Sequence, residues 1–168
     1  MAKKVVLILP PHGVNEEEYR IVRGTLEGRG HPVTTASVWA GSVEATDGTS
    51  VPAEMRIHDI KTYEFEAFVF LGGEGVRALF DHAGTRKLIK DVSYKTLAAS
   101  GDAVALVALA GGLSKKKVTA PAEWVDLIKR NGAVFTGTPL RVDGRIVTAQ
   151  AASSAEQFAN AVSRALAG

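Results

Sequence analysis

The chain has 168 residues, of which 46% are hydrophobic and 23% are charged. This composition is typical of a folded globular protein and excludes a disordered tail over most of the chain. The 20 Lys and Arg residues nearly balance the 18 Asp and Glu residues, so the basic face that a nucleic-acid partner needs is not expected. We expect one compact domain over residues 1–168.

The sequence also argues against a membrane segment and against sulfur chemistry. The longest apolar runs, residues 5–10 and 103–110, are far shorter than the roughly 20 residues that span a bilayer. A strand-like run begins at residue 5 without a cleavage-site pattern, so no signal peptide and a cytoplasmic location are expected. The chain has no cysteine, which excludes disulfides, thiolate metal sites and thiol catalysis.

The N-terminal part predicts two buried strands with a helix between them. Residues 5–9 form a continuous β-branched and aliphatic run, as in a strand buried on both faces of a parallel sheet. Asn15 is placed to cap a helix whose acidic first turn is residues 16–18, and Gly28 ends that helix. Residues 33–38 predict the second strand.

A hairpin is predicted next. Residues 42–57 contain two short β-prone pieces on either side of Asp47-Gly48, which is a strong tight-turn signal. Pro52 lies in the second piece and keeps it at a sheet edge, because proline cannot donate a ladder hydrogen bond.

The rest of the chain alternates strands and helices. Further strands are predicted at residues 67–71, 96–100, 116–120, 133–136 and 146–148. Helical segments are predicted at residues 76–80, 87–94, 102–109 and 121–130, with a capped C-terminal helix at 153–166. The alternation predicts an α/β fold with three layers, doubly wound around a mostly parallel sheet, with the hairpin as a small excursion.

Ligands of such folds bind beyond the carboxyl ends of the strands, so the loops there are the candidate sites. One of them is the glycine loop, which we define as Gly72, Gly73, Glu74 and Gly75. Its amides favour an anion, or form one wall of an oxyanion hole, or simply make a tight strand-to-helix turn.

A second loop resembles a nucleophile elbow, because small residues surround the junction of strand 96–100 with the next helix. The projecting position is Gly101, which offers no nucleophile. Ser100 and Asp102 are the nearest polar residues, and Asp102 is also suited to capping the helix. A catalytic Ser100 would need a base, and His12 is the one histidine expected at this edge of the sheet.

Glu18 is the third candidate. It shares the buried helix face with Val22 and Leu26, so its carboxyl is expected to point toward the sheet with a raised pKa. Such a group can donate a proton or a hydrogen bond at neutral pH. The other histidines are expected to be solvated, with no metal-ligand spacing among them: His31, His58 and His82.

With these loops placed, the chain resembles the ThiJ/PfpI superfamily, which includes the Parkinson-disease-associated protein and relatives of class I glutamine amidotransferase domains. The resemblance rests on the order and spacing of several weak motifs: residues 4–9, Gly13 followed by Glu18, residues 26–33, Asp47-Gly48, and residues 65–73, 110–119 and 142–148. It implies a flavodoxin-like or class I glutamine amidotransferase-like fold and a homodimer or higher homo-oligomer.

In that superfamily the elbow presents a reactive Cys, and the Glu that matches Glu18 hydrogen-bonds its thiol. Here Gly101 stands at the Cys position. The resemblance associates such proteins with glyoxalase, deglycase-like and peptidase activities and with redox sensing. All of these depend on the thiolate, so they are not expected here by the usual mechanism.

Three hypotheses follow. The first is a member without thiol chemistry that binds a small ligand, or has a stress or chaperone-like role, with a site formed by Glu18, the glycine loop and the bend at Gly101 and Asp102. The second is an enzyme with replaced hydrolase, glyoxalase or deglycase-like chemistry, in which Glu18 acts with Asp102 or Ser100. The third is a purely structural interaction module. No cofactor, metal, nucleic-acid or membrane partner is expected.

Overall fold

The structure is a computed structural model that describes residues 2–168. A seven-stranded sheet lies at its centre, with strand order β11-β12-β8-β7-β1-β3-β6. Neighbouring strands are parallel, apart from β11 against β12. The strands are β1 (Val5–Ile8), β3 (Val33–Ser37), β6 (Met55–Arg56), β7 (Ala67–Phe70), β8 (Thr96–Ser100), β11 (Leu140–Asp143) and β12 (Ile146–Ala149).

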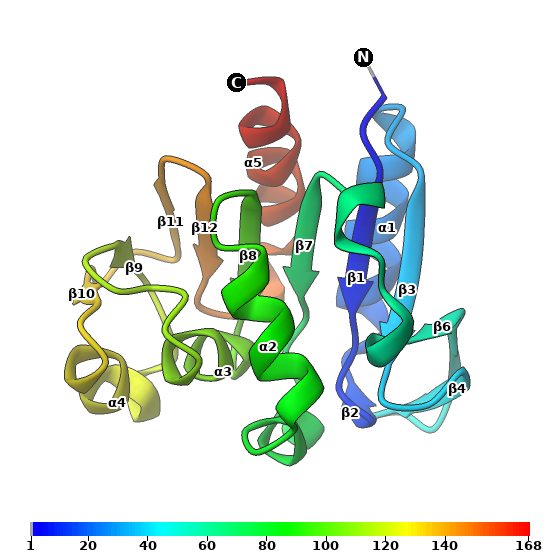
Figure 1. Ribbon diagram of the computed structural model, residues 1–168, viewed down its shortest axis with the longest axis horizontal. Coiled ribbons are helices and arrows are strands. Elements are labelled where there is room, and N and C mark those ends of the chain that lie inside the picture. Colours follow the sequence, from blue (N-terminus) through cyan, green and yellow to red (C-terminus); the bar gives the residue numbers. More distant parts are fainter. Residues whose placement is uncertain (1) are drawn as a thin grey trace.

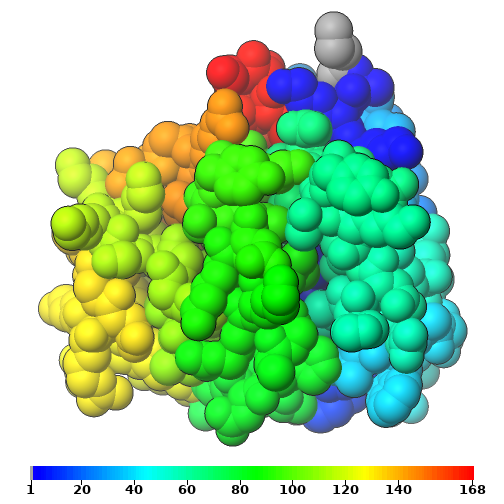
Figure 2. All heavy atoms as spheres, in the orientation of Figure 1, coloured from blue at the N-terminus to red at the C-terminus, as the bar shows by residue number. Residues whose placement is uncertain are grey.

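Helices cover both faces of this sheet, which gives the three predicted layers (Figure 1). On β1, Val5 and Leu7 pack on one side while Val6 and Ile8 pack on the other, because successive strand side chains alternate. The first side is covered by α1 (Glu16–Gly28) and α5 (Ala155–Ala167), and the second by α2 (Ala83–Asp91), α3 (Ala103–Leu109) and α4 (Val125–Arg130). Figure 2 shows α2, in green, across the middle of the second face.

A three-stranded sheet lies beside the carboxyl end of β1 and has the order β2-β4-β5. Its strands are β2 (His12–Val14), β4 (Gly41–Ala45) and β5 (Ser50–Ala53). The antiparallel pair β4 and β5 confirms the predicted hairpin, and Pro52 lies in the edge strand β5 as expected. A further two-stranded sheet pairs β9 (Lys117–Val118) with β10 (Val134–Phe135).

Several helix boundaries differ from the predictions for local reasons. The helix α2 begins four residues earlier than predicted, because Nδ1 of His82 accepts a hydrogen bond from the amide of Thr85 and caps it. The segment after the glycine loop is a 3₁₀ helix, η3 (Glu74–Leu79). A short 3₁₀ turn, Ala152–Ser154, precedes α5, and no side-chain hydrogen bond caps that helix, so the predicted cap is wrong.

The histidine predictions hold only in part. His58 is exposed, as expected. His31 is buried, with 7% of its surface exposed, so the expectation that it is solvated is wrong. Its Nδ1 accepts a hydrogen bond from the amide of Lys3, and its Nε2 lies 3.2 Å from Oγ of Ser163. Both ring nitrogens therefore have partners that replace water.

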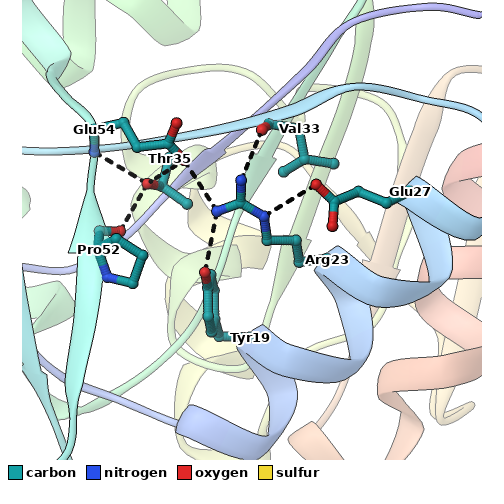
Figure 3. A network of polar contacts seen from close by, with 7 residues as sticks. All are labelled: Tyr19, Arg23, Glu27, Val33, Thr35, Pro52 and Glu54. Atoms are coloured by element: carbon teal, nitrogen blue, oxygen red, sulfur yellow. Dashed lines mark hydrogen bonds and ion pairs between the residues drawn. The ribbon is translucent and has the colours of Figure 1, made fainter.

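Arg23 ties α1 to the neighbouring strands through a polar network (Figure 3). Its guanidinium donates to Glu54 at 3.0 Å, to Glu27 at 3.3 Å, to the hydroxyl of Tyr19 at 3.1 Å and to the carbonyl of Val33 at 3.1 Å. The planar fork of arginine matches such a set of acceptors.

In the described part of the chain, no helix is long and apolar enough to cross a bilayer.

Candidate functional site

A pocket of about 320 Å³ opens where the chain leaves β1, β7 and β8. This is the carboxyl edge of the main sheet, where the fold predicts ligand binding. The small sheet and the start of α1 complete its walls. The lining residues are Gly13, Asn15, Glu18, Thr46, Gly72, Gly73, Glu74, Gly101, Asp102 and Ala152.

Glu18 reaches this pocket because of where α1 begins. The side chain of Asn15 accepts a hydrogen bond from the Glu18 amide at 2.9 Å and caps the helix, as predicted. This start places Glu18 on the same buried face as Val22 and Leu26, and only 3% of its surface is exposed. The sequence prediction of a buried carboxyl on this face is confirmed.

The Glu18 carboxyl accepts a hydrogen bond from a hydroxyl that itself accepts one from a backbone amide. Oγ of Ser100 donates to Oε1 of Glu18 at 3.1 Å, and the amide of Gly72 donates to Oγ of Ser100 at 3.2 Å. Burial raises the pKa of Glu18 to about 7, against the opposing effects of the Ser100 hydroxyl and the Gly72 amide. Desolvation outweighs the two hydrogen bonds here, since no cation offsets it. Near neutral pH the group can both donate and accept a proton.

The bend after β8 is left-handed at Gly101, where φ is 55°, a conformation that glycine adopts without steric cost. The amide of Gly101 donates to the carbonyl of Ala149 at 3.0 Å, which fixes the bend to β12. Apart from atoms of Ser100 and Asp102, a Cβ added at Gly101 would have within 4 Å only the Cα of Gly72, 3.9 Å away, among the described residues. The space over this bend is therefore open, and a side chain would fit there at the cost of a strained φ.

The glycine loop is built differently. Gly73 has a φ of 146° and forms an isolated antiparallel bridge with Val14. A Cβ added to it would lie 2.2 Å from the carbonyl oxygen of Gly13. Glycine is therefore required at this position by backbone packing between the loop and β2.

Asp102 makes a contact that the sequence did not predict. Its Oδ1 accepts a hydrogen bond from Nε1 of Trp124 at 2.7 Å. Its side chain makes no capping hydrogen bond to α3, so the interpretation of Asp102 as a side-chain cap is wrong. Its own amide has no hydrogen-bond partner among residues 2–168, and Asp102 is one of the residues that line the pocket.

The remaining candidates lie at different distances from the pocket. Gly72, Gly73, Glu74 and Gly101 line it. Ser100 is fully buried behind Glu18 and does not line it. His12 is exposed on β2, is not among the lining residues, and is not hydrogen-bonded to Ser100, whose hydroxyl instead meets Glu18 and Gly72.

Sequence reasoning missed Thr46 and Ala152 as lining residues, used Gly13 only as part of a family motif and Asn15 only as a helix cap, and missed Trp124. Thr46, Ala152 and Trp124 carry no local signal. Three carboxyl side chains line the pocket, from Glu18, Glu74 and Asp102, and no Lys, Arg or His does so. Residues 2–168 contain no group of three His, Asp or Glu side chains that could hold a metal ion.

A comparison of the sequence with models of known protein families assigns the chain to a family. The model of the DJ-1/PfpI family matches residues 3–165. The chain belongs to the DJ-1/PfpI family. It is a member without cysteine, and Gly101 occupies its elbow.

Similar proteins agree with this assignment. An uncharacterized protein of Methanocaldococcus jannaschii is 28% identical, over 97% of this chain and 82% of its own. The glutathione-independent glyoxalase DJR-1.2 of Caenorhabditis elegans is 23% identical, over 94% of this chain and 85% of its own.

Solved structures share the fold closely. The ThiJ/PfpI domain protein of Brachyspira murdochii is 26% identical, with a TM-score of 0.93 over 98% of this chain and 96% of its own. Drosophila melanogaster DJ-1beta is 22% identical, with a TM-score of 0.89 over 100% of this chain and 92% of its own. At 22% identity, the similarity to the Drosophila structure shows a shared fold alone.

Proposed function

We propose that this protein binds a small uncharged carbonyl compound in the pocket without forming a covalent bond to it. The observation that carries the proposal is the buried Glu18 carboxyl, with a pKa of about 7, beside the open space over Gly101 in a chain without cysteine. The carboxyl can donate to a ligand or accept from it, and Gly101 has no side chain that could attack the ligand.

The lining of the pocket supports an uncharged ligand. Its three carboxyl side chains are not balanced by a cation, so a ligand carboxylate or phosphate would be repelled. The free amide of Asp102 suits a carbonyl oxygen. The C. elegans relative is a glyoxalase by name, which is consistent with a carbonyl ligand for this scaffold.

A matched pair of probes tests this proposal. Acetamide and acetate have the same shape but differ in charge, so we expect acetamide to shift the amide NMR signals of Gly101 and Asp102 while acetate at the same concentration does not. The Glu18→Gln variant should bind acetamide at least as well at pH 8 as the native chain does. Equal shifts with acetate, or shifts confined to residues outside the pocket, would contradict the proposal.

Turnover separates binding from catalysis. We expect the native chain not to consume methylglyoxal, because it lacks a nucleophile at the elbow. The Gly101→Cys variant places a thiol in the open space beside Glu18, and we expect it to gain consumption of methylglyoxal. The double variant Gly101→Cys, Glu18→Gln is its control and should lose that gain.

A second candidate function is supported by one feature, the near-neutral pKa of Glu18, which suits a general acid or base. In this alternative Glu18 acts with Asp102, which lines the same pocket, or with Ser100, whose hydroxyl already donates to it. Consumption of methylglyoxal by the native chain that disappears in both Glu18→Gln and Asp102→Asn would favour this enzyme over the binding protein.

Self-association, a cytoplasmic location and a stress or chaperone-like role also belong to the proposal. The resemblance to this family implies a homodimer or a higher homo-oligomer. Sedimentation equilibrium should therefore give at least twice the chain mass of 17.7 kDa. A mass of one chain at micromolar concentration would exclude self-association. Suppression of the thermal aggregation of an added client protein tests the chaperone-like role.

A further inference from the structure

Trp124 lies behind the pocket lining and contacts it through Asp102. It ends the 3₁₀ helix η4 (Ala122–Trp124) just before α4, and 6% of its surface is exposed. Its Nε1 donates to Oδ1 of Asp102 at 2.7 Å, which joins it to the bend after β8. A hydrogen bond with a carboxylate acceptor at this distance is stronger than one between neutral groups.

The ring of Trp124 also holds the segment that follows the glycine loop. Phe80 packs against it edge to face, with ring centroids 5.6 Å apart, and the guanidinium carbon of Arg77 lies 4.5 Å from the ring centroid. Arg77 in turn pairs with Glu123, the neighbour of Trp124, at 3.5 Å. Arg77 belongs to η3, whose first residue, Glu74, lines the pocket. One indole thus contacts both Asp102, which lines the pocket, and Arg77, which shares a 3₁₀ helix with the lining residue Glu74.

The hydrogen bond from Nε1 of Trp124 fixes the position of the Asp102 carboxyl. Asp102 does not cap α3, and the indole is the hydrogen-bond partner that its side chain has among residues 2–168. Without that donor the side chain is free to take other rotamers, and the amides of Val104 and Ala105 in the first turn of α3 do not hold it, because they already donate to the carbonyls of Gly101 and Asp102. Such a rotation would redirect the carboxyl, which changes the charges that a ligand meets.

We propose that Trp124 is a positioning residue of the pocket, which acts by holding the Asp102 carboxyl and the bend at Gly101 in their binding geometry. This inference rests on the proposed function, because the geometry matters only if the pocket binds a ligand. Trp124 itself does not line the pocket, so its effect on binding passes through Asp102.

The test compares variants that separate the indole N–H from the ring. Trp124→Phe keeps an aromatic ring for Phe80 and Arg77 but removes the donor. We expect its affinity for acetamide to fall about fivefold, which corresponds to about 1 kcal/mol, the net contribution of a typical intramolecular hydrogen bond. Asp102→Asn keeps an acceptor oxygen for the indole, so its loss of acetamide affinity should be smaller than that of Asp102→Ala. Asp102→Ala should match the loss of Trp124→Phe.

The double variant Trp124→Phe, Asp102→Ala tests whether the two residues act as one unit. Its loss should equal that of either single variant, because the same contact is removed once. The other tryptophan provides the matched control. Trp39 is 72% exposed, so Trp39→Phe should leave acetamide affinity unchanged. Additive losses, or a Trp124→Phe variant that melts at a lower temperature but binds acetamide normally, would overturn the proposal.

A measurement without ligand keeps this proposal distinct from the proposed function. In the free protein the indole N–H of Trp124 should exchange with solvent far more slowly than that of Trp39, and Asp102→Ala should speed it up. Trp124→Phe should move the amide NMR signals of Gly101 and Asp102. If the native chain does not bind acetamide but these signals behave as expected, the proposed function fails while the positioning contact stands. Fast exchange at Trp124 in the native chain would exclude the contact.

Discussion

Glu18 and Arg23 lie on the same helix, and each brings a charged group toward the sheet. The side chain of Arg23 is 22% exposed and pairs with Glu27 and Glu54. Glu18 is 3% exposed, and its hydrogen-bond partner is the neutral hydroxyl of Ser100. The Arg23 network therefore stabilises the packing of α1, while Glu18 keeps an acid in a site where its ionised form is disfavoured. A buried acid without a cation, in the lining of a pocket, is the feature of this helix on which the proposed binding site rests.

The largest expected effect is the pH dependence that Glu18 gives to stability. Its pKa is about 7 in the folded chain, above the ordinary value of 4.5. The folded state therefore holds this proton more tightly than the unfolded state. The associated stabilisation is present below the unfolded pKa and is lost as the pH rises through 7. Over that window the native chain should lose about 3 kcal/mol relative to Glu18→Gln, which does not titrate.

Chemical denaturation of both chains between pH 4 and pH 8 measures this difference. Glu54→Gln is the matched control, since it removes a partly exposed carboxyl that is paired with Arg23. A native-minus-variant difference for Glu18→Gln that stays constant over this range would mean that Glu18 is not buried as an acid.

Arg23→Met should cause the next largest loss of stability. Unlike the effect of Glu18, this loss should depend on salt and not on pH. The substitution keeps the apolar stem but removes donors from two carboxylates and from the carbonyl of Val33, at a cost of about 1–2 kcal/mol. That loss should shrink at high salt but change little between pH 6 and pH 8. Urea unfolding at two salt concentrations measures this loss of stability. A strong dependence of the loss on pH in this range would contradict the predicted difference between Arg23 and Glu18.

Ser100→Ala tests the hydrogen bond between the Ser100 hydroxyl and the Glu18 carboxyl. The hydroxyl lowers the pKa of Glu18, so its removal should raise that pKa further. The variant should also lose about 1 kcal/mol at pH 8, where the ionised carboxyl and the Gly72 amide both lose a partner. The carboxyl ¹³C signal of Glu18, followed through a pH titration, reports the shift. A lower pKa in the variant would contradict the hydrogen-bond assignment.

The smallest effect is expected at the surface of the same helix. Glu16 pairs with Arg20 at 3.3 Å, and the arginine side chain is 64% exposed. Glu16→Gln should therefore change stability by less than about 0.5 kcal/mol. A thermal melt at neutral pH is sufficient to detect a larger loss, which would show that exposed charges on α1 matter more than the comparison implies.

The α/β architecture was predictable from the sequence because its signals are local. Buried strands such as β1 and β7 are continuous apolar runs, and Asp47-Gly48 specifies its hairpin turn without distant help. The short strand β2 and the edge strand β11 were missed. Both depend on a partner strand for their hydrogen bonds, and their own residues include charged or turn-forming types.

The sequence by itself determined the alternation of the main buried strands with helices, the burial of Glu18 and the absence of a nucleophile at Gly101, since apolar periodicity and residue identity are sufficient for each. Only the tertiary structure decided which side chains meet. The contact of Asp102 with Trp124 joins residues 22 positions apart, and that of Ser100 with Glu18 joins residues 82 positions apart. Burial of His31 likewise depends on residues from both ends of the chain. Such contacts follow from the folding of distant segments together, and no local pattern encodes them.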